Sequence, residues 1–294
     1  MAEQHADQAA GLRRMSAPRP VRVIAVASGK GGVGKTNVTV NLAAAFSQIG
    51  RKALIMDADL GLANVDLMLG LQPKYNLSHV ISGERTLEEV IVDGPSGIQI
   101  VPAASGIQAM AELSSAEHAG LIRAFSELNT DVDVMLVDSA AGISDNVVSF
   151  SKAAQEVLVV VCDEPASITD AYALIKVLSR DHGIRRFHIV ANMARDERQG
   201  RELFGKLMRA TDQFLEDVIL DYMGHVPFDD YLRKAVQRQK VVMEAYPSSK
   251  AARAFKDLAA KADKWPMPQV AGGYLEFFVE RLVQAQTQEQ EAWL

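Results

Sequence analysis

Residues 29–36 read Gly29-Lys30-Gly31-Gly32-Val33-Gly34-Lys35-Thr36. An apolar run, residues 21–27, precedes this stretch, and residues 37–48 have the composition of a helix. A glycine-rich loop between a buried strand and a helix is the setting of a P-loop, because loop N–H groups and the helix N-terminus together surround a phosphate. Lys35 is expected to bridge the β- and γ-phosphates, and the Thr36 hydroxyl to bind magnesium. The stretch therefore predicts a site for ATP, ADP and Mg²⁺.

Apolar runs alternate with helical stretches along the rest of the chain. The runs cover residues 21–27, 53–56, 98–101, 132–137, 156–162 and 187–191, and the helical stretches include 37–48, 116–128, 170–180 and 200–214. Several runs are apolar without alternation, as in strands buried on both faces. This order predicts an α/β fold of the P-loop NTPase kind, a mostly parallel sheet flanked by helices on both faces.

Composition narrows the classes of function. The 294 residues are 48% hydrophobic and 23% charged, with a net charge of −6, which argues against bulk electrostatic binding of nucleic acid. The single cysteine, Cys162, excludes internal disulfides and supplies no ligand set for zinc or an iron–sulfur cluster within one subunit. No run approaches the roughly 18–20 apolar residues that span a bilayer, and the first residues do not resemble a secretory signal. We expect a cytoplasmic protein and no direct contact with nucleic acid.

Carboxylates follow two of the apolar runs. Asp57 and Asp59 come after residues 53–56, and Asp138 ends the run 132–137 in the Walker B pattern. Carboxylates at the carboxyl ends of parallel strands face the ligand crevice of such a sheet. Asp138 is therefore expected to hold magnesium through a water molecule.

Lys30 is the residue by which the loop resembles the deviant Walker A motif of the MinD/ParA family. In that family this lysine reaches across a dimer interface to the partner's nucleotide, so the resemblance implies an ATP-sandwich homodimer with a MinD-like fold. The other interpretation of Lys30 is a solvated lysine on a loop.

The same resemblance implies roles for further residues. Asp59 would polarise the attacking water and Asp57 would support the magnesium shell. With Lys30 and Lys35, Asp59 completes the candidate catalytic set for slow, regulatory hydrolysis of ATP to ADP and phosphate. Candidate adenine contacts by resemblance are Asn192, Pro227 and Phe228. An ordinary turn at a strand end is the alternative for these three.

An amphipathic pattern occupies residues 269–294. Its apolar face combines the residues Tyr274, Leu275, Phe277, Phe278, Val279 and Leu282. Such a face suits reversible binding to a lipid surface, as in the terminal helix of MinD. Arg281 is the one cation among residues 274–286, whereas a membrane-surface helix usually carries several. A helix docked on the body of the protein therefore stays open as the alternative.

The N-terminal stretch Asp7-Gln8-Ala9-Ala10-Gly11-Leu12-Arg13 resembles the DQAxxLR motif of the FlhG family, also called FleN. The resemblance implies that this segment forms a helix on the flagellar GTPase FlhF and directs Gln8 toward its nucleotide. Candidate contacts are Asp7, Gln8, Ala9, Leu12 and Arg13. A polar segment that folds on binding suits such a regulatory role. The similarity extends over almost the whole chain, including residues 101–106, 161–165 and 275–282.

These observations divide the chain into a flexible extension (1–20), a MinD-like ATPase domain (21–268) and a C-terminal amphipathic helix (269–294). The expected function is an ATP-dependent dimerising switch that regulates flagellar number and placement. Expected partners are FlhF, a transcription activator of the FleQ or FlrA type, flagellar C-ring proteins and the inner-membrane surface, with the cell pole as a location. A division-site ATPase of the MinD type and a DNA-partitioning ATPase of the ParA type remain alternatives.

Overall fold

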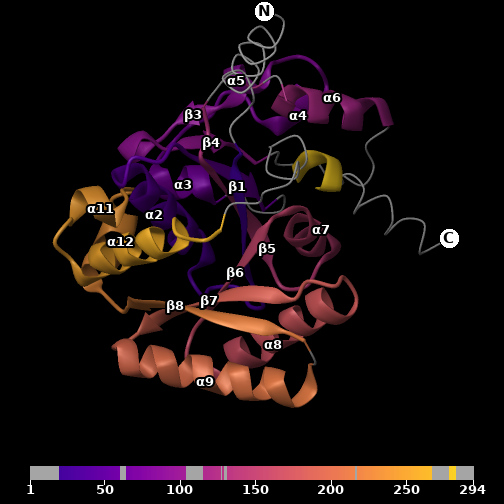
Figure 1. Ribbon diagram of the computed structural model, residues 1–294. Coiled ribbons are helices and arrows are strands. Elements are labelled where there is room, and N and C mark those ends of the chain that lie inside the picture. The colour runs from indigo at the N-terminus through magenta and orange to yellow at the C-terminus, as the bar shows by residue number, and fades with distance from the viewer. Residues whose placement is uncertain are drawn as a thin grey trace, which may run out of the picture.

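A computed structural model describes residues 20–59, 64–103, 115–126, 128, 131–215, 217–266 and 278–282. Within these ranges, eight strands form one sheet at the centre of the molecule (Figure 1). The strand order is β3-β4-β2-β5-β1-β6-β7-β8, and every pair is parallel except β3 with β4. The strands are β1 (Arg22–Ser28), β2 (Ala53–Ala58), β3 (Val92–Asp93), β4 (Gln99–Val101), β5 (Val134–Ala141), β6 (Glu156–Val161), β7 (Arg186–Ala194) and β8 (Ile219–Pro227).

Helices cover both faces of the sheet, which confirms the predicted fold class. One face is covered by α2 (Lys35–Gln48), α10 (Asp230–Gln237), α11 (Val242–Ala245) and α12 (Lys250–Ala262), with α3 (Val65–Leu69) and the 3-10 turn η1 (Pro95–Gly97) beside α2. The opposite face is covered by α4 (Leu77–Ile81), α5 (Leu87–Val90), α6 (Ser115–Ser126), α7 (Asp145–Ala153), α8 (Pro165–Arg180) and α9 (Glu197–Phe214).

The central strand β1 shows why its sequence is apolar without alternation. Ile24 and Val26 pack among α2 and α12, whereas Val23 and Ala25 pack in the core on the other face. Successive side chains of a strand point to opposite faces, so a strand covered on both sides needs an apolar residue at every position. The loop that follows β1 is thereby fixed to the rigid centre of the molecule.

The described part of the C-terminal segment is docked on the body of the protein. Residues 278–282 are helical, and Phe278, Val279 and Leu282 are at most 1% exposed. The rings of Phe278 and Phe150 of α7 stack with centroids 6.5 Å apart. The docked alternative therefore holds for these residues, because the apolar face is buried in the core rather than presented to solvent. Tyr274, Leu275 and Phe277, like the segment Asp7–Arg13, lie outside the described residues.

Among the described helices, none is long and apolar enough to cross a bilayer.

Candidate nucleotide site

The glycine-rich loop joins the carboxyl end of β1 to the first residue of α2, Lys35. Gly34 has a φ of +83°, and a Cβ atom there would lie 2.5 Å from Nδ2 of Asn192. A Cβ atom on Gly29 would lie 2.2 Å from the backbone of Asp170. Both positions therefore require glycine. Gly34 needs it for its positive φ and for the nearby Asn192 side chain, and Gly29 needs it because the backbone of Asp170 is so close.

Asp138, in the buried part of β5, contacts three side chains of α2. Its Oδ1 lies 2.8 Å from Nζ of Lys35 and 2.7 Å from the hydroxyl of Thr39, and its Oδ2 accepts a hydrogen bond of 2.7 Å from Thr36. Asp138 is fully buried and Lys35 is 7% exposed. The carboxylate thus holds the lysine and the threonine of the loop in one fixed cluster.

Asp57 lies beside Asp138 because β2 and β5 are neighbours and these two residues are paired in register. It accepts backbone hydrogen bonds from Asp59, Asn64 and Val65 at 3.1–3.2 Å. Burial, reinforced by the charge of Asp138, raises the pKa of Asp57 to about 7 despite these bonds. Ionised Asp57 beside ionised Asp138 is therefore unfavourable unless a cation binds next to the two carboxylates.

Lys30 and Asp59 are the candidate catalytic residues with the most exposed surroundings. Lys30 Nζ lies 2.9 Å from Glu164 Oε2 of the same chain, and the two side chains are 38% and 62% exposed. Asp59 is half-buried next to Asp57, at the border of residues 60–63, which lie outside the described part of the chain. Lys30 therefore has an observed partner within its own chain.

The three candidate adenine contacts meet in one cavity. It has a volume of about 250 Å³ and is lined by Gly34, Asn192, Pro227 and Phe228, among others. Asn192 donates a 2.7 Å hydrogen bond from Nδ2 to the carbonyl of Val33, so the end of β7 is fastened to the loop. Phe228 is 65% exposed at the rim. An apolar slot next to the helix start has the shape and chemistry to hold a planar base.

This geometry agrees with the comparison with protein families. A family model described as ParA, an NUBPL iron-transfer P-loop NTPase, matches residues 20–262. The chain belongs to the ParA family of P-loop NTPases. MinD and ParA proteins of this family are ATPases. The chain therefore has the fold and the nucleotide-binding loop of an ATPase family.

Within the ParA family, the chain is similar to two proteins whose names refer to flagella or to an antiactivator. It is 60% identical over 273 residues to the antiactivator FleN of Pseudomonas aeruginosa, covering 93% of this chain and 97% of that protein. It is 32% identical over 227 residues to the flagellum site-determining protein YlxH of Helicobacter pylori, covering 77% of this chain and 76% of the relative. This ParA-family chain is thus a homologue of FleN and YlxH.

A solved structure supports the fold of this ParA-family chain. The septum site-determining protein MinD of Pyrococcus horikoshii, complexed with Mg-ADP, matches with a TM-score of 0.66 and 29% identity. The match covers 83% of this chain and 96% of that one.

The residues of this ParA-family site fit a nucleotide with magnesium. Among the described residues, no three His, Cys, Asp or Glu side chains gather into a metal-binding group. Mg²⁺ in phosphate sites is typically bound by one or two protein oxygens, with phosphate and water completing the shell. The Thr36 hydroxyl and the Asp138 carboxylate, with Asp57 beside them, offer such a set, and the raised pKa of Asp57 indicates a place that a cation would stabilise.

Three kinds of contact around the site are absent from the sequence predictions. Thr39 contacts Asp138, and its place one helical turn after Lys35 is the signal that could have found it. Glu164 pairs with Lys30 across 134 positions of sequence, a distance that no local pattern spans. The base-sized cavity is also lined by Met193, Leu232, Val236 and Phe255, apolar residues that no sequence motif singles out.

Proposed function

We propose that this chain is an ATP-dependent dimerising switch that hydrolyses ATP slowly and regulates the number and placement of flagella. The observation that carries the proposal is the buried cluster of Lys35, Thr36 and Asp138 beneath the P-loop of a chain 60% identical to FleN. The flagellar role rests on the names of the FleN and YlxH relatives.

Each residue of the cluster has a defined role in the proposal. Lys35 binds the β- and γ-phosphates, and the loop N–H groups bind their oxygens. Thr36, Asp57 and Asp138 hold magnesium, which neutralises charge on the phosphates when it is bound. Asp59 orients the attacking water, a role that needs position more than basicity because charge stabilisation dominates phosphoryl transfer.

The exposed pair of Lys30 and Glu164 supports the dimer step. An ion pair this exposed contributes little to folding, so Lys30 can exchange Glu164 for a phosphate at small cost. In a dimer that buries both nucleotides, Lys30 would bind the triphosphate of the partner subunit. Nucleotide shifts the monomer–dimer equilibrium only by its difference in affinity for the two states.

The partners are proposed from the relatives and from the tails. The name of FleN as an antiactivator points to a transcription activator, of the FleQ or FlrA type, as a binding partner. The segment Asp7–Arg13 would bind FlhF, with Gln8 directed to the GTPase, and C-ring proteins are further candidates. Undocking of the helix around Phe278 would give reversible contact with the inner membrane. The higher identity to FleN than to MinD favours this role over division-site selection.

Size-exclusion chromatography with light scattering tests the switch. Wild type is expected to be monomeric with ADP and to shift toward a dimer with ATP and magnesium. The Asp59→Ala variant is expected to remain a dimer in ATP because it binds but does not hydrolyse the nucleotide. A monomer of Asp59→Ala at saturating ATP would contradict both the dimer step and the role of Asp59.

A further inference from the structure

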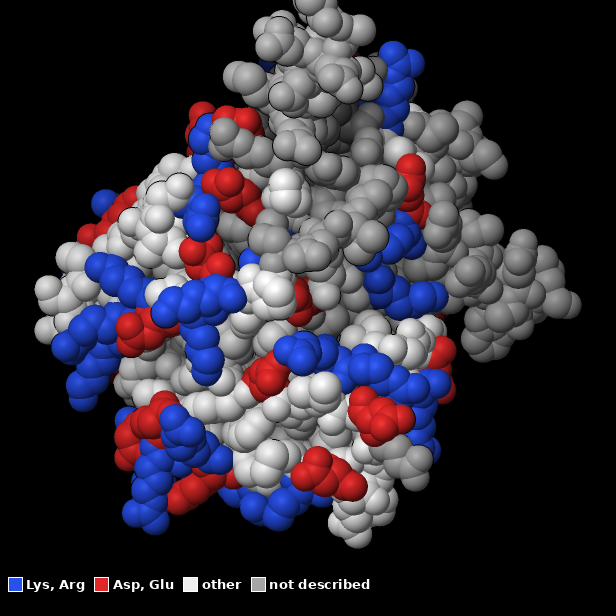
Figure 2. Space-filling view, in the orientation of Figure 1, with Lys and Arg blue, Asp and Glu red and all other residues white. Residues whose placement is uncertain are grey.

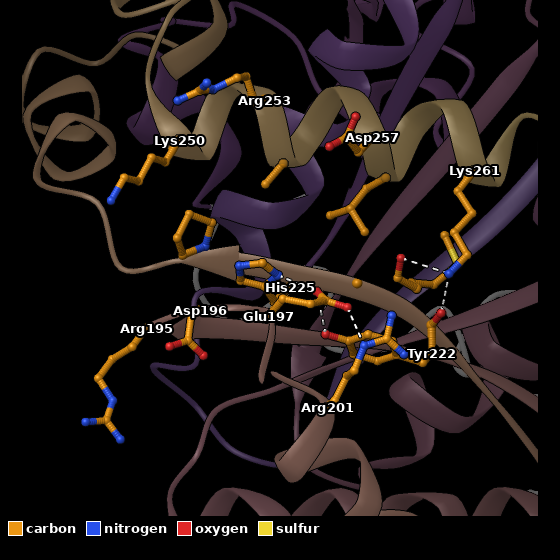
Figure 3. Close-up of a pocket in the computed structure, with 15 residues that line it drawn as sticks. Arg195, Asp196, Glu197, Arg201, Tyr222, His225, Lys250, Arg253, Asp257 and Lys261 are labelled. Atoms are coloured by element: carbon orange, nitrogen blue, oxygen red, sulfur yellow. Dashed lines mark hydrogen bonds and ion pairs between the residues drawn. The ribbon is translucent and has the colours of Figure 1, made fainter. Parts of the chain in front are cut away.

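A second and larger cavity lies at the β8 edge of the sheet. It has a volume of about 600 Å³ and opens between α12 on one side and the start of α9 on the other (Figure 3). The strand β8, which ends the strand order, runs along its base. We call this cavity the α9–α12 cleft. The P-loop residues do not line it, and the nucleotide cluster uses none of its charged side chains.

The cleft has an apolar base and a charged rim. Met223 and Leu258, at 4% and 2% exposure, and the buried Pro227 form part of the base. The lysines and arginines of the rim are exposed and lie on both sides of β8 (Figure 3). An apolar centre surrounded by exposed polar groups is the usual anatomy of a protein-binding surface, because the centre supplies affinity and the rim supplies selectivity.

The rim carries an excess of positive charge in a chain whose net charge is −6. Five Lys and Arg side chains line the cleft against three carboxylates. Glu197 is already neutralised, since it lies 2.7 Å from Arg201 and 2.8 Å from His225. Asp196 is also engaged, because it caps α9 by accepting a hydrogen bond from the backbone of Gln199. The third carboxylate is Asp257 of α12. The lining residues as a set therefore carry a net positive charge.

Two of these cations are available to a ligand. Lys250 and Arg253 lie on the first turn of α12, and within the described part of the chain neither side chain forms an ion pair or a hydrogen bond. Lys261, in contrast, donates to the carbonyls of Tyr222 and Met223. Lys250 and Arg253 are therefore the positions at which negative charge would be bound.

The edge of β8 itself is protected against strand addition. The Lys261 ammonium donates to the carbonyl groups of Tyr222 and Met223 in β8, where the register between β8 and β7 shifts. Pro227, at the end of β8, has no N–H group to donate. Lysine, proline and irregular pairing are features that block the edges of natural sheets. A peptide ligand would thus bind in the cleft by its side chains rather than by backbone hydrogen bonds to β8.

The distribution of charge separates two classes of polyanion. Around α12 and α9, Figure 2 shows Lys and Arg interspersed with Asp and Glu, while a row of adjacent basic side chains crosses the face farther to the right. Nucleic acid is bound by clustered cations that follow a phosphate backbone. A mixed rim over an apolar base instead complements a peptide with both carboxylates and an apolar side chain.

We propose that the α9–α12 cleft docks an acidic segment of a partner protein. One apolar side chain of the segment packs against Met223, Leu258 and Pro227, and its carboxylates face Lys250 and Arg253. This cleft shares Pro227 with the base-sized cavity, but Lys250 and Arg253 line only the cleft, and the proposal does not depend on the flagellar assignment.

Fluorescence anisotropy tests the proposal with a fluorescein-labelled peptide of alternating glutamate and leucine. The full-length protein is expected to bind this peptide, and Lys250→Glu with Arg253→Glu to weaken binding by at least about tenfold. Both glutamates lie near the start of α12, where negative charge favours the helix, so the variant should fold. Lys256→Glu changes the charge of an exposed residue of α12 that does not line the cleft, and should bind like wild type.

Three outcomes would overturn the proposal. The first is no binding to wild type, or equal binding to wild type and the double variant. The second is equal binding of a peptide with lysine in place of glutamate. The third is displacement of the peptide by a short DNA duplex with the same dependence on Lys250 and Arg253, which would make nucleic acid the occupant. ATPase activity of each variant, measured in parallel, reports the nucleotide site separately.

Discussion

Lys35 and Asp138 form a buried ion pair in which Nζ and Oδ1 are 2.8 Å apart. Asp138 is held on both oxygens, because Thr36 and Thr39 also donate to it. Removing one member of a buried pair leaves the other charge without compensation, which costs more than the pair contributes. The base of the P-loop is therefore sensitive to single substitutions in both ligand binding and folding.

Lys35→Ala is expected to abolish ATP binding and to lower the free energy of unfolding by about 3 kcal/mol, because Asp138 stays buried without its cation. Calorimetric titration with ATP and urea unfolding measure the two effects. Lys52→Ala is the matched control, since Lys52 forms an exposed pair with Asp131. Micromolar ATP binding by Lys35→Ala would contradict the phosphate site.

Lys30→Ala and Glu164→Ala break the same exposed ion pair and should leave the melting temperature unchanged. Their effects on assembly should differ. In the Asp59→Ala background with ATP, Lys30→Ala is expected to be monomeric, whereas Glu164→Ala should dimerise as well as its parent. Light scattering distinguishes the two, and a stable dimer without Lys30 would remove its proposed contact with the partner's nucleotide.

Gly34→Ala should weaken nucleotide binding at least about tenfold, because the new methyl group meets the Asn192 amide at 2.5 Å and φ is +83°. Gly183→Ala is the control for backbone strain alone, since Gly183 has a φ of +71° and no atom near its Cβ position. Binding of a fluorescent ADP analogue measures both. Equal affinity of the two variants would show that the contact between Gly34 and Asn192 is not needed for the nucleotide.

Phe277→Glu with Phe278→Glu is expected to prevent sedimentation with anionic phospholipid vesicles in ATP, because charge replaces the apolar face of the segment. Phe214→Glu, at an aromatic residue that is 54% exposed on α9, is the control and should sediment like wild type. Sedimentation that persists in the double variant would eliminate the proposed membrane contact. ATP hydrolysis should be retained in the Phe214→Glu control. The double variant also loses the buried contact of Phe278 with Phe150, so its melting temperature should fall.

The sequence predicts the central strands well and the edge of the sheet poorly. β1, β2, β5 and β6 are apolar at nearly every position, so their periodicity marks them as buried strands. β8 carries Asp221, Gly224 and His225 and is only partly buried, because among the described strands it pairs with β7 alone. Its sequence therefore lacks the apolar run by which the other strands are found.

In the nucleotide site, too, the residues marked by local sequence patterns could be predicted, whereas contacts between residues far apart in the sequence could not. The glycine loop, Lys35 and Thr36 are adjacent in sequence, and Asp57 and Asp138 each end an apolar run, so local patterns suffice to propose them. The ion pair of Lys30 with Glu164 depends on the packing of β1 against β6, and the contact of Phe278 with Phe150 depends on the docking of a distant segment. Contacts of this kind require the three-dimensional fold.

Pro227 borders both the base-sized cavity beside the P-loop and the α9–α12 cleft. An occupant of either cavity that displaced this shared ring would change the width of the other cavity as well. Thermodynamic linkage then demands symmetry: if an occupant of the cleft alters the affinity for ATP by some factor, ATP must alter the affinity for that occupant by the same factor.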